Sequence, residues 1–341
     1  MRFEFYHAGL DDVPKLSVDG TVANSVHFSH WEGNETPTEL KADTSTEIAL
    51  NLVASSKKST LTRGIELVTN NHFDTDGILS VWTVLTGERA LELRETLIPA
   101  AEAGDFCEFK SEAGVKASIV IQGPDQAAPS DEPGSPIASY LAKEKVDDDA
   151  RAYDLVLPEV ERILTRTGDY EHLWREPWKK IATAMDSFAR GTSEVTEFPD
   201  VSLSLVNLGT DVFGPRGFDP AQHAAPYTVI SQHAKGRLFL ITTPFQDGWA
   251  YRIDYPYYSW AETVVRPHID RRDFSQLLNE LNSAETPAAG VWKLDSREMT
   301  SAIKFLDADG KLAASPMQPD EVAGILRTAL LAQAPARSLH A

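Results

Sequence analysis

The sequence predicts an α/β protein in two parts: a strand–helix layer with a partly parallel sheet, then a β-rich α+β domain. The length of 341 residues suits about two domains. Strand-like and helix-like runs alternate through the first part, whereas β-branched and aromatic residues dominate short runs from Glu194 onward. We therefore expect domains at 1–192 and 193–331, a flexible Pro- and Gly-rich loop at 122–136, and a frayed tail at 332–341.

The first part alternates between strands and helices. A strand is expected at 25–31, and a helix follows at 42–55, where Thr44 and Glu47 have capping-box spacing. A second strand is expected at 64–73, followed by a helix with apolar residues at i, i+3, i+4 and i+7. The remaining helices are expected at 88–103, disturbed by Pro99, at 135–145, at 152–168, and at 175–191 with Pro177 in its first turn.

The second part reads as strands separated by turns. The runs 201–209, 226–245 and 248–265 are rich in β-branched and aromatic residues. Leu238–Phe245 is apolar enough to be a buried strand. A helix at 270–285, a hairpin at 300–315 and a final helix at 319–333 complete the chain.

Charge and composition exclude several classes of function. The 51 acidic residues outnumber the 32 Lys and Arg residues, for a net charge of −19, which disfavours binding to duplex nucleic acid or to an anionic membrane. No run of 18 apolar residues predicts a membrane span, and the first residues do not resemble a signal peptide. The single cysteine, Cys107, suits a reducing compartment and is expected to be a buried structural thiol. We expect a cytoplasmic protein, and a homodimer remains an open alternative to a monomer.

A histidine and two aspartates cluster at one predicted strand–helix corner. His72, Asp74 and Asp76 follow the predicted strand, and Gly77 opens the helix. In an extended chain, the three side chains alternate onto one side. One imidazole and two carboxylates are suitable ligands for Mn²⁺, Mg²⁺ or Zn²⁺, and a helix start favours a phosphate. The structural alternative is that Asp76 caps the helix and the other two form hydrogen bonds nearby.

A second Asp-x-Asp-Gly string lies near the other end of the chain. Asp307–Gly310 stands between two short strand-like runs, with no histidine before it and no helix directly after it. Asp-Gly in that context is typical of a tight turn, in which glycine supplies a positive φ. We therefore predict a turn there rather than a site.

The string His72-x-Asp74-x-Asp76-Gly77-x-x-Ser80 resembles the first motif of the DHH phosphoesterase family, which also lies between a strand and a helix. The resemblance implies that the histidine and both aspartates bind catalytic divalent metals, usually manganese. It also implies that the metals activate water to cleave a phosphodiester or pyrophosphate bond. The Asp-His-His triplet and the glycine- and histidine-rich motif of that family do not occur in this sequence.

Further metal ligands are expected outside the motif. His30 and Glu32 follow the predicted strand at 25–31, and Asp105 lies downstream of the motif. If the strand at 25–31 neighbours the strand at 64–73, both would end at the same edge of a parallel sheet, where ligands gather. The alternative for His30 and Glu32 is an ordinary polar strand end.

Candidate substrate-binding residues come from both parts. Gly77 would let a substrate approach the backbone, and Arg252, Arg266 and His268 form a basic cluster in an acidic chain. Arginine can hold a phosphate through two parallel hydrogen bonds. The alternative for these cations is surface ion pairs with neighbouring aspartates.

The favoured interpretation is a divalent-metal-dependent hydrolase, similar to a phosphoesterase, that acts on a small phosphorylated or nucleotide substrate. Asp74, Asp76 and His72 would be catalytic, and Mn²⁺ or Mg²⁺ would be the cofactor. One alternative is a non-catalytic, degenerate relative that binds without turnover. Another is an enzyme of a family with no described mechanism.

Overall fold

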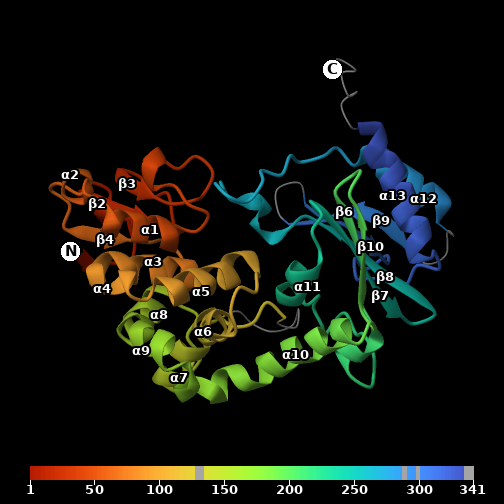
Figure 1. The fold of residues 1–341 in the computed structure, drawn as a ribbon, viewed down its shortest axis with the longest axis horizontal. Coiled ribbons are helices and arrows are strands. Elements are labelled where there is room, and N and C mark those ends of the chain that lie inside the picture. The colour runs from red at the N-terminus through yellow and green to blue at the C-terminus, as the bar shows by residue number, and fades with distance from the viewer. Residues whose placement is uncertain (127–133, 286–289, 297–299, 334–341) are drawn as a thin grey trace. The chain divides into compact units, whose positions relative to one another are not determined.

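The computed structural model describes residues 1–126, 134–285, 290–296 and 300–333, and it divides into two compact units (Figure 1). Within those residues, the first unit runs from Met1 to Lys179 and also includes Trp260–His268. The second unit comprises Lys180–Ser259 and the chain from Ile269 onward. The division therefore falls inside a helix rather than near residue 192. Much of the predicted loop at 122–136, and most of the tail, lie outside the described residues.

The sheet of the first unit is entirely parallel. Its strand order is β1-β4-β2-β3, so β2 lies between β3 and β4. The prediction of parallel pairing is confirmed, but β2 separates the two strands that the sequence suggested as neighbours. The four strands are β1 (Arg2–Phe3), β2 (Lys15–Val18), β3 (Ser25–Phe28) and β4 (Leu67–Thr69).

Two helices of the first unit, α1 (Ser45–Ala54) and α3 (Thr75–Thr86), begin near the carboxyl edge of its sheet. Helix α1 begins where the Thr44 hydroxyl accepts the amide of Glu47, as the capping-box spacing predicts. Helix α3 follows β4, and it packs against α1 and α5. The other helices that belong wholly or partly to this unit are α2 (Lys58–Leu61), α4 (Glu88–Leu91), α5 (Arg94–Phe106), α6 (Glu112–Gln122), α7 (Pro136–Ala142), α8 (Asp149–Val156), α9 (Val160–Thr165) and α10 (Glu171–Ala189).

Two prolines behave differently from the sequence prediction. Pro99 lies inside α5 and does not end it. A side chain on Gly114 of α6 would meet the ring of Pro99 at 2.7 Å, so close packing between the two helices supports this part of α5. Pro177 lies inside α10, because that helix already begins at Glu171. Tertiary packing therefore outweighs the local preference of proline.

The second unit contains a six-stranded mixed sheet of order β5-β6-β7-β8-β10-β9, in which only β6 and β7 are parallel. One face of this sheet carries an apolar core that includes Leu240, Ile253 and Phe305. The strands are β5 (Glu194–Phe198), β6 (Leu203–Asn207), β7 (Leu238–Phe245), β8 (Gly248–Asp254), β9 (Val291–Leu294) and β10 (Ser301–Leu306). The helices are α11 (Tyr227–His233), α12 (Ser275–Ala284) and α13 (Pro319–Gln333).

The β-rich α+β prediction for this part is confirmed, with one local difference. Helix α11 occupies a stretch that its β-branched residues had assigned to strands, because Val229 and Ile230 are buried on a helical face. The Asp307–Gly310 prediction is confirmed as a turn. Gly310 has a φ of 78°, and the Asp307 carboxylate accepts the amides of Asp309 and Lys311.

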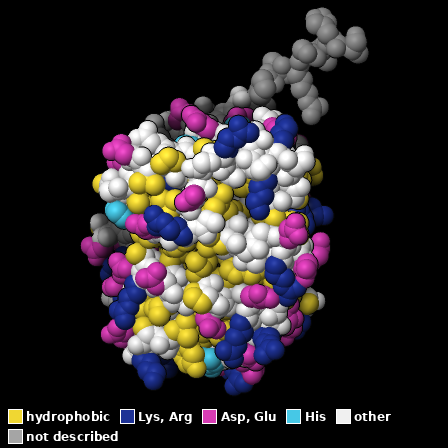
Figure 2. All heavy atoms as spheres, turned by 90° about the vertical axis from the view of Figure 1, so that its left-hand side faces the viewer, with side chains coloured by type: hydrophobic (Ala, Val, Ile, Leu, Met, Phe, Trp, Pro, Cys, Tyr) yellow, Lys and Arg dark blue, Asp and Glu magenta, His cyan; other side chains and the backbone are white. Residues whose placement is uncertain are grey.

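The net negative charge is not gathered on the face that Figure 2 shows, where acidic and basic side chains are interspersed around a band of hydrophobic side chains. Such mixing is usual for a solvated protein surface. Among the described residues, no helix combines the length and apolar character that crossing a bilayer requires.

Candidate metal centre

The candidate site forms at the carboxyl edge of the parallel sheet. The register pairs Val18 of β2 with Phe28 of β3, and Ser17 of β2 with Thr69 of β4. The residues that follow these strands therefore leave the sheet at the same level. Because parallel strands present their carboxyl ends together, side chains from three separate segments can meet there.

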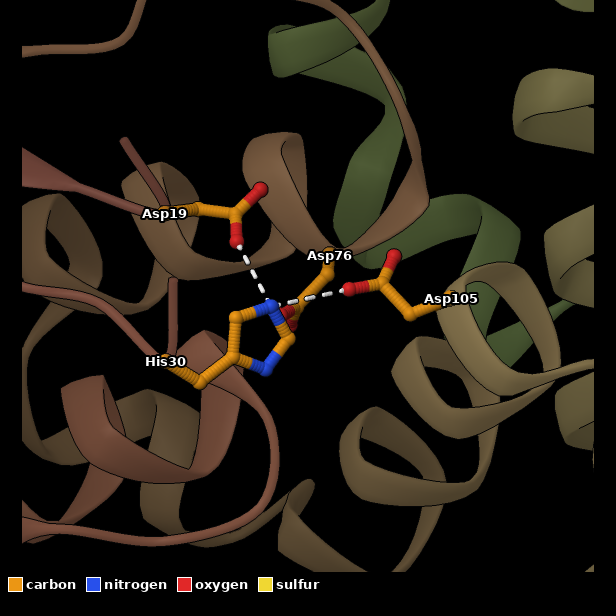
Figure 3. Close-up of side chains that lie close together, drawn as sticks. All are labelled: Asp19, His30, Asp76 and Asp105. Carbon is orange, nitrogen blue, oxygen red and sulfur yellow. Dashed lines mark ion pairs between the residues drawn. The ribbon is translucent and has the colours of Figure 1, made fainter. Parts of the chain in front are cut away.

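The first group of side chains consists of Asp19, His30, Asp76 and Asp105, whose ligand atoms all lie within 4.8 Å of one another. Figure 3 shows the imidazole of His30 pointing between the carboxylates of Asp19 and Asp105. Its Nε2 lies 3.4 Å from Asp19 Oδ1, 3.8 Å from Asp76 Oδ2 and 3.2 Å from Asp105 Oδ2. The His30 and Asp76 side chains are fully buried. This group brings together two of the three ligands predicted outside the motif.

A backbone contact fixes the orientation of His30. Its Nδ1 lies 2.6 Å from the main-chain oxygen of Asp43, which can only accept, so Nδ1 donates. The other ring nitrogen, Nε2, is buried and makes no hydrogen bond among the described residues. A histidine held at one nitrogen by a carbonyl, with the other directed into a group of carboxylates, has the arrangement of a metal ligand.

The second group consists of Asp19, His72 and Asp74. His72 Nε2 lies 3.1 Å from Asp19 Oδ2 and 3.1 Å from Asp74 Oδ2. The side chains of His72 and Asp74 are 25% and 30% exposed, so this group is the more accessible of the two. Asp74 also caps α3, because its Oδ1 accepts the amide of Gly77 at 2.7 Å. Asp74 therefore has one oxygen for the helix and one for the site.

The N-cap of α3 is Asp74 and not Asp76, contrary to the structural alternative. Asp76 lies in the first turn, and its two oxygens accept the amides of Ser45 and Thr46 at 2.6 and 2.7 Å. These amides open α1, so Asp76 joins the starts of two helices. A carboxylate oxygen has two lone pairs, and each Asp76 oxygen therefore keeps one beyond its amide hydrogen bond.

Asp19 belongs to both groups, and the sequence did not reveal it. Its Oδ1 faces the His30 group while its Oδ2 faces His72, so one carboxylate links the two groups. The residue has a φ of 57°, a left-handed conformation that aspartate adopts more readily than most non-glycine residues. The local signal for it is weak: an Asp-Gly pair follows β2, but the Lys-Leu-Ser-Val sequence of that strand does not read as a buried strand.

The electrostatics show how strongly the centre attracts positive charge. Burial raises the pKa of Asp76 to about 7 and that of Asp105 well above its usual range, with the neighbouring carboxylates adding to both shifts. Burial alone would lower the pKa of His30, but Asp105, Asp76 and Asp19 outweigh it and raise that pKa to about 10. Burial would also lower the pKa of His72, but Asp74 and Asp19 outweigh it and raise that pKa to about 12. In the metal-free protein, protons therefore offset the negative charge of these buried carboxylates. A bound metal cation could take over that role.

A segment from late in the chain packs against His30. Glu262 donates its amide to the main-chain oxygen of His30 at 2.7 Å, and Trp260 packs edge-on to the imidazole at 5.0 Å between ring centroids. Arg266 forms ion pairs with three carboxylates, Asp43, Glu102 and Glu108, at 2.5 to 2.7 Å. The segment Trp260–His268 is therefore an integral part of the first unit.

The remaining predicted residues lie as follows. Glu32 is exposed and belongs to neither group, because the chain turns after Trp31. Side chains of Asn70, Tyr153 and Asp74 surround Gly77. The space beside the Gly77 backbone is therefore filled by the protein itself and not left for a substrate. The Arg266 side chain is largely buried and engaged by carboxylates, His268 is exposed, and Arg252 lies on β8 of the second unit.

The donor set fits hard or borderline divalent cations. Two imidazoles and four carboxylates are suited to Mn²⁺, Mg²⁺ or Zn²⁺. Nε2 of His30 and Oδ1 of Asp19 are buried and face each other at 3.4 Å, and neither makes a hydrogen bond among the described residues, so a bound cation would satisfy both. Cys107, by contrast, is a buried thiol outside both groups, as the sequence predicts.

The fold and the site together define a mixed α/β protein with a buried Asp–His centre. The chain belongs to a family of unknown function, DUF6687, whose family model matches residues 2–333. No curated protein matches it. A solved structure, a pGpG-specific phosphodiesterase (PggH) from Vibrio cholerae, is similar with 12% identity and a TM-score of 0.35, over 93% of this chain and 83% of that one.

Proposed function

We propose that this chain is a divalent-metal-dependent hydrolase that acts on the phosphate ester of a small molecule or nucleotide. The observation that carries the proposal is the Asp19 carboxylate, which directs one oxygen to each of two ligand groups. A carboxylate shared in this way is suited to hold two cations a few ångströms apart. Paired cations are a common arrangement in phosphatases and nucleases.

The chain's own residues divide the work between the two groups. His30, Asp76 and Asp105 would hold a cation in the buried group, and His72 and Asp74 would hold one in the accessible group. Divalent cations in such sites lower the pKa of water and stabilise negative charge on phosphoryl oxygens. The partial exposure of His72 and Asp74 places the accessible group where a substrate can reach it.

An aromatic side chain beside the accessible group favours a substrate with a flat ring. Trp31 is 38% exposed, and its ring lies 5.2 Å from the His72 ring, measured between centroids. Trp260 supports it edge-on at 5.6 Å. A partly exposed tryptophan beside a phosphate-directed centre can stack on a nucleobase, which favours a nucleotide over an aliphatic phosphate ester.

The test measures metal content and hydrolysis in the same preparations. The purified chain is stripped with a chelator, reloaded with Mn²⁺, dialysed and assayed for bound metal and for cleavage of bis(p-nitrophenyl) phosphate. Asp19→Asn should weaken both sites, whereas His72→Ala should release only the accessible metal and Asp105→Asn only the buried one. Glu32→Gln is the matched control, because Glu32 is exposed and lies in neither group. Equal metal content in wild type and all the variants would contradict the proposal.

One observation favours the non-catalytic alternative. Asp74 caps α3, and Asp76 accepts hydrogen bonds from two amides of α1, so both motif aspartates stabilise helix starts. If that is their whole role, the chain binds no metal, or it binds metal without cleaving any phosphodiester. Metal-loaded protein that lacks activity on both bis(p-nitrophenyl) phosphate and dinucleotides would support this alternative.

A further inference from the structure

A second site lies in the other unit, on the face of the six-stranded sheet that points away from its apolar core. Side chains alternate along each strand, so Leu240, Ile253 and Phe305 enter the core while their neighbours Ile241 and Arg252 face the other side. On that other side is a cavity of about 420 Å³. This volume is within the usual range for small-molecule sites.

The walls of the cavity are mainly apolar. Ile241 and Ala250 form its floor on β7 and β8, and Phe213 and Phe218 form one side, with ring centroids 4.9 Å apart. The turn after β10 closes another side with Leu312. A ligand with a flat or branched apolar body would bury its surface against these walls.

The charged groups of the cavity are cations, and His223 and Thr243 add neutral polar groups. Arg252, Lys304 and Lys311 line it, and none of its described lining residues is acidic, although the chain carries 51 acidic residues. The register of β8 and β10 sets Lys304 directly opposite Arg252. Like charges opposite each other on neighbouring strands destabilise a sheet unless an anion lies between them.

The carboxylates that pair with these cations do not line the cavity. They also leave some N–H donors of the cations without a hydrogen bond. Arg252 directs Nε and Nη2 to one oxygen of Asp254, at 3.0 and 2.9 Å, and its Nη1 makes no hydrogen bond among the described residues. Lys304 contacts Asp295 at 2.7 Å with one of its three donors. Lys311 forms no ion pair in the described part of the chain. An entering anion would therefore find unused donors on all three side chains.

We propose that this cavity binds a small organic anion with an aromatic body, whose carboxylate or phosphate group contacts Arg252, Lys304 and Lys311. The site is built entirely from the second unit and does not depend on the proposed hydrolase function. The aromatic body would lie against Phe213, Phe218 and Ile241. Acidic molecules would be admitted in preference to cations by a protein that is otherwise strongly negative.

The test uses two fluorescent probes that differ in charge. The full chain is titrated with 8-anilinonaphthalene-1-sulfonate, which is anionic, and with N-phenyl-1-naphthylamine, its uncharged counterpart. Wild type should bind the anionic probe saturably at one site. Lys304→Met should raise its dissociation constant at least about tenfold, as expected for a lost charged hydrogen bond, and should leave the uncharged probe unaffected. Lys304→Arg should retain binding.

Two further variants separate the site from general effects. Lys293 is an exposed lysine that lies opposite Lys304 in the register of β9 and β10, but it does not line the cavity. Lys293→Met should therefore change the dissociation constant of the anionic probe less than about twofold. Ala250→Leu fills the floor of the cavity and should weaken both probes. Unchanged binding of the anionic probe in Lys304→Met, or equal loss in Lys293→Met, overturns the proposal.

Competition identifies the anionic group of the ligand. 1-Naphthoate and phenylphosphonate, which carry a carboxylate and a phosphonate on an aromatic ring, are titrated against the bound anionic probe. Displacement by either one supports the site, and the tighter competitor identifies the preferred group. Failure of both to displace the probe overturns the proposal.

Discussion

The main-chain oxygen of Asp43 accepts the Nδ1 hydrogen of His30, while the Asp43 carboxylate binds Arg266 and the amide groups around it. One residue thus connects a candidate metal ligand to the segment Trp260–His268. The connection sets the tautomer of His30, because only Nδ1 can carry the proton when Nε2 faces a cation. The geometry of the candidate metal centre therefore depends on contacts made far along the chain.

Replacement of Arg266 tests how much this segment contributes to stability. Its side chain is 11% exposed, and its guanidinium is paired with Asp43, Glu102 and Glu108. In Arg266→Met, Glu108 keeps a longer contact with Lys110 at 3.6 Å. The substitution leaves Asp43 and Glu102 largely buried without a paired cation, so we expect a loss of about 3–5 kcal/mol in the free energy of unfolding. Urea unfolding of the metal-free protein, followed by circular dichroism, measures it.

Arg94→Met is the matched control for Arg266→Met. Arg94 pairs with Glu47 in the same unit, but the two side chains are 36% and 28% exposed. Removal of this more open pair should cost about 1 kcal/mol or less. Equal effects of the two substitutions would mean that the Arg266 contacts are not energetically special.

Gly77→Ala tests the crowding at the motif glycine. An added Cβ would lie 2.7 Å from Asn70 Nδ2, 2.9 Å from Tyr153 Oη and 3.0 Å from Asp74 Oδ1. We expect a loss of about 1–3 kcal/mol in unfolding free energy, and weaker Mn²⁺ binding because Asp74 is displaced. Gly324→Ala, in α13, is the control: no atom lies within 4 Å of its added Cβ, so the change should stabilise the helix by about 0.5–1 kcal/mol. An unchanged free energy of unfolding in Gly77→Ala would contradict the prediction that this position is crowded.

The motif corner could be predicted because its residues are adjacent in sequence. His72, Asp74 and Asp76 occupy one strand–helix connection, so the local pattern is sufficient to name them as candidates, although the structure places Asp76 in the buried group and the other two in the accessible group. His30 and Asp105 could be named as candidates, since the first follows a recognisable strand and the second is an acid near a helix end. Their meeting at one point, however, depends on the parallel pairing and on the packing of α5 against α3.

Asp19 could not be predicted by the same reasoning. Strand β2 has only four residues and begins with Lys15, a residue type that rarely occurs in a buried strand. The Lys15 ammonium is buried because it donates to the main-chain oxygens of Leu10, Asp11 and Asn24. Those contacts, and the place of β2 between β3 and β4, are tertiary properties. The same holds for the link between Asp43 and Arg266, which joins distant parts of the chain.

The stability of the metal-free protein should fall as pH rises from about 5 to about 8. Folded Asp76 has a pKa raised by burial to about 7, so its stabilising proton is fully present below the usual value near 4 and is lost as pH rises through about 7. Burial lowers the pKa of His30, but Asp105 and its neighbours outweigh it and raise that pKa to about 10. The stability that this proton contributes is therefore also lost as pH rises above the usual histidine pKa. Urea titrations in the presence of chelator measure this trend.

Asp105→Asn separates this effect from the general charge of the protein. Burial raises the pKa of Asp105 well above its usual range, so asparagine reproduces the shape of its protonated form. The variant should therefore lose less stability between about pH 5 and pH 8 than wild type does. An identical slope in the two proteins would show that the centre does not control the pH dependence.

Protons and metal should compete directly for the centre. At neutral pH, the two histidines are protonated in the metal-free protein: burial opposes this, but the surrounding aspartates raise the pKa of His30 to about 10 and that of His72 to about 12. Metal binding requires neutral imidazoles and ionised carboxylates, so occupation of both groups should release at least two protons, one from each histidine and the rest from Asp76 and Asp105, and Mn²⁺ affinity should rise with pH. Calorimetric titration in two buffers of different ionisation enthalpy counts the protons released. His72→Ala should release about one proton fewer, because only the buried group then exchanges its protons for metal. Binding heats that are the same in both buffers for wild type would rule out the histidines as ligands.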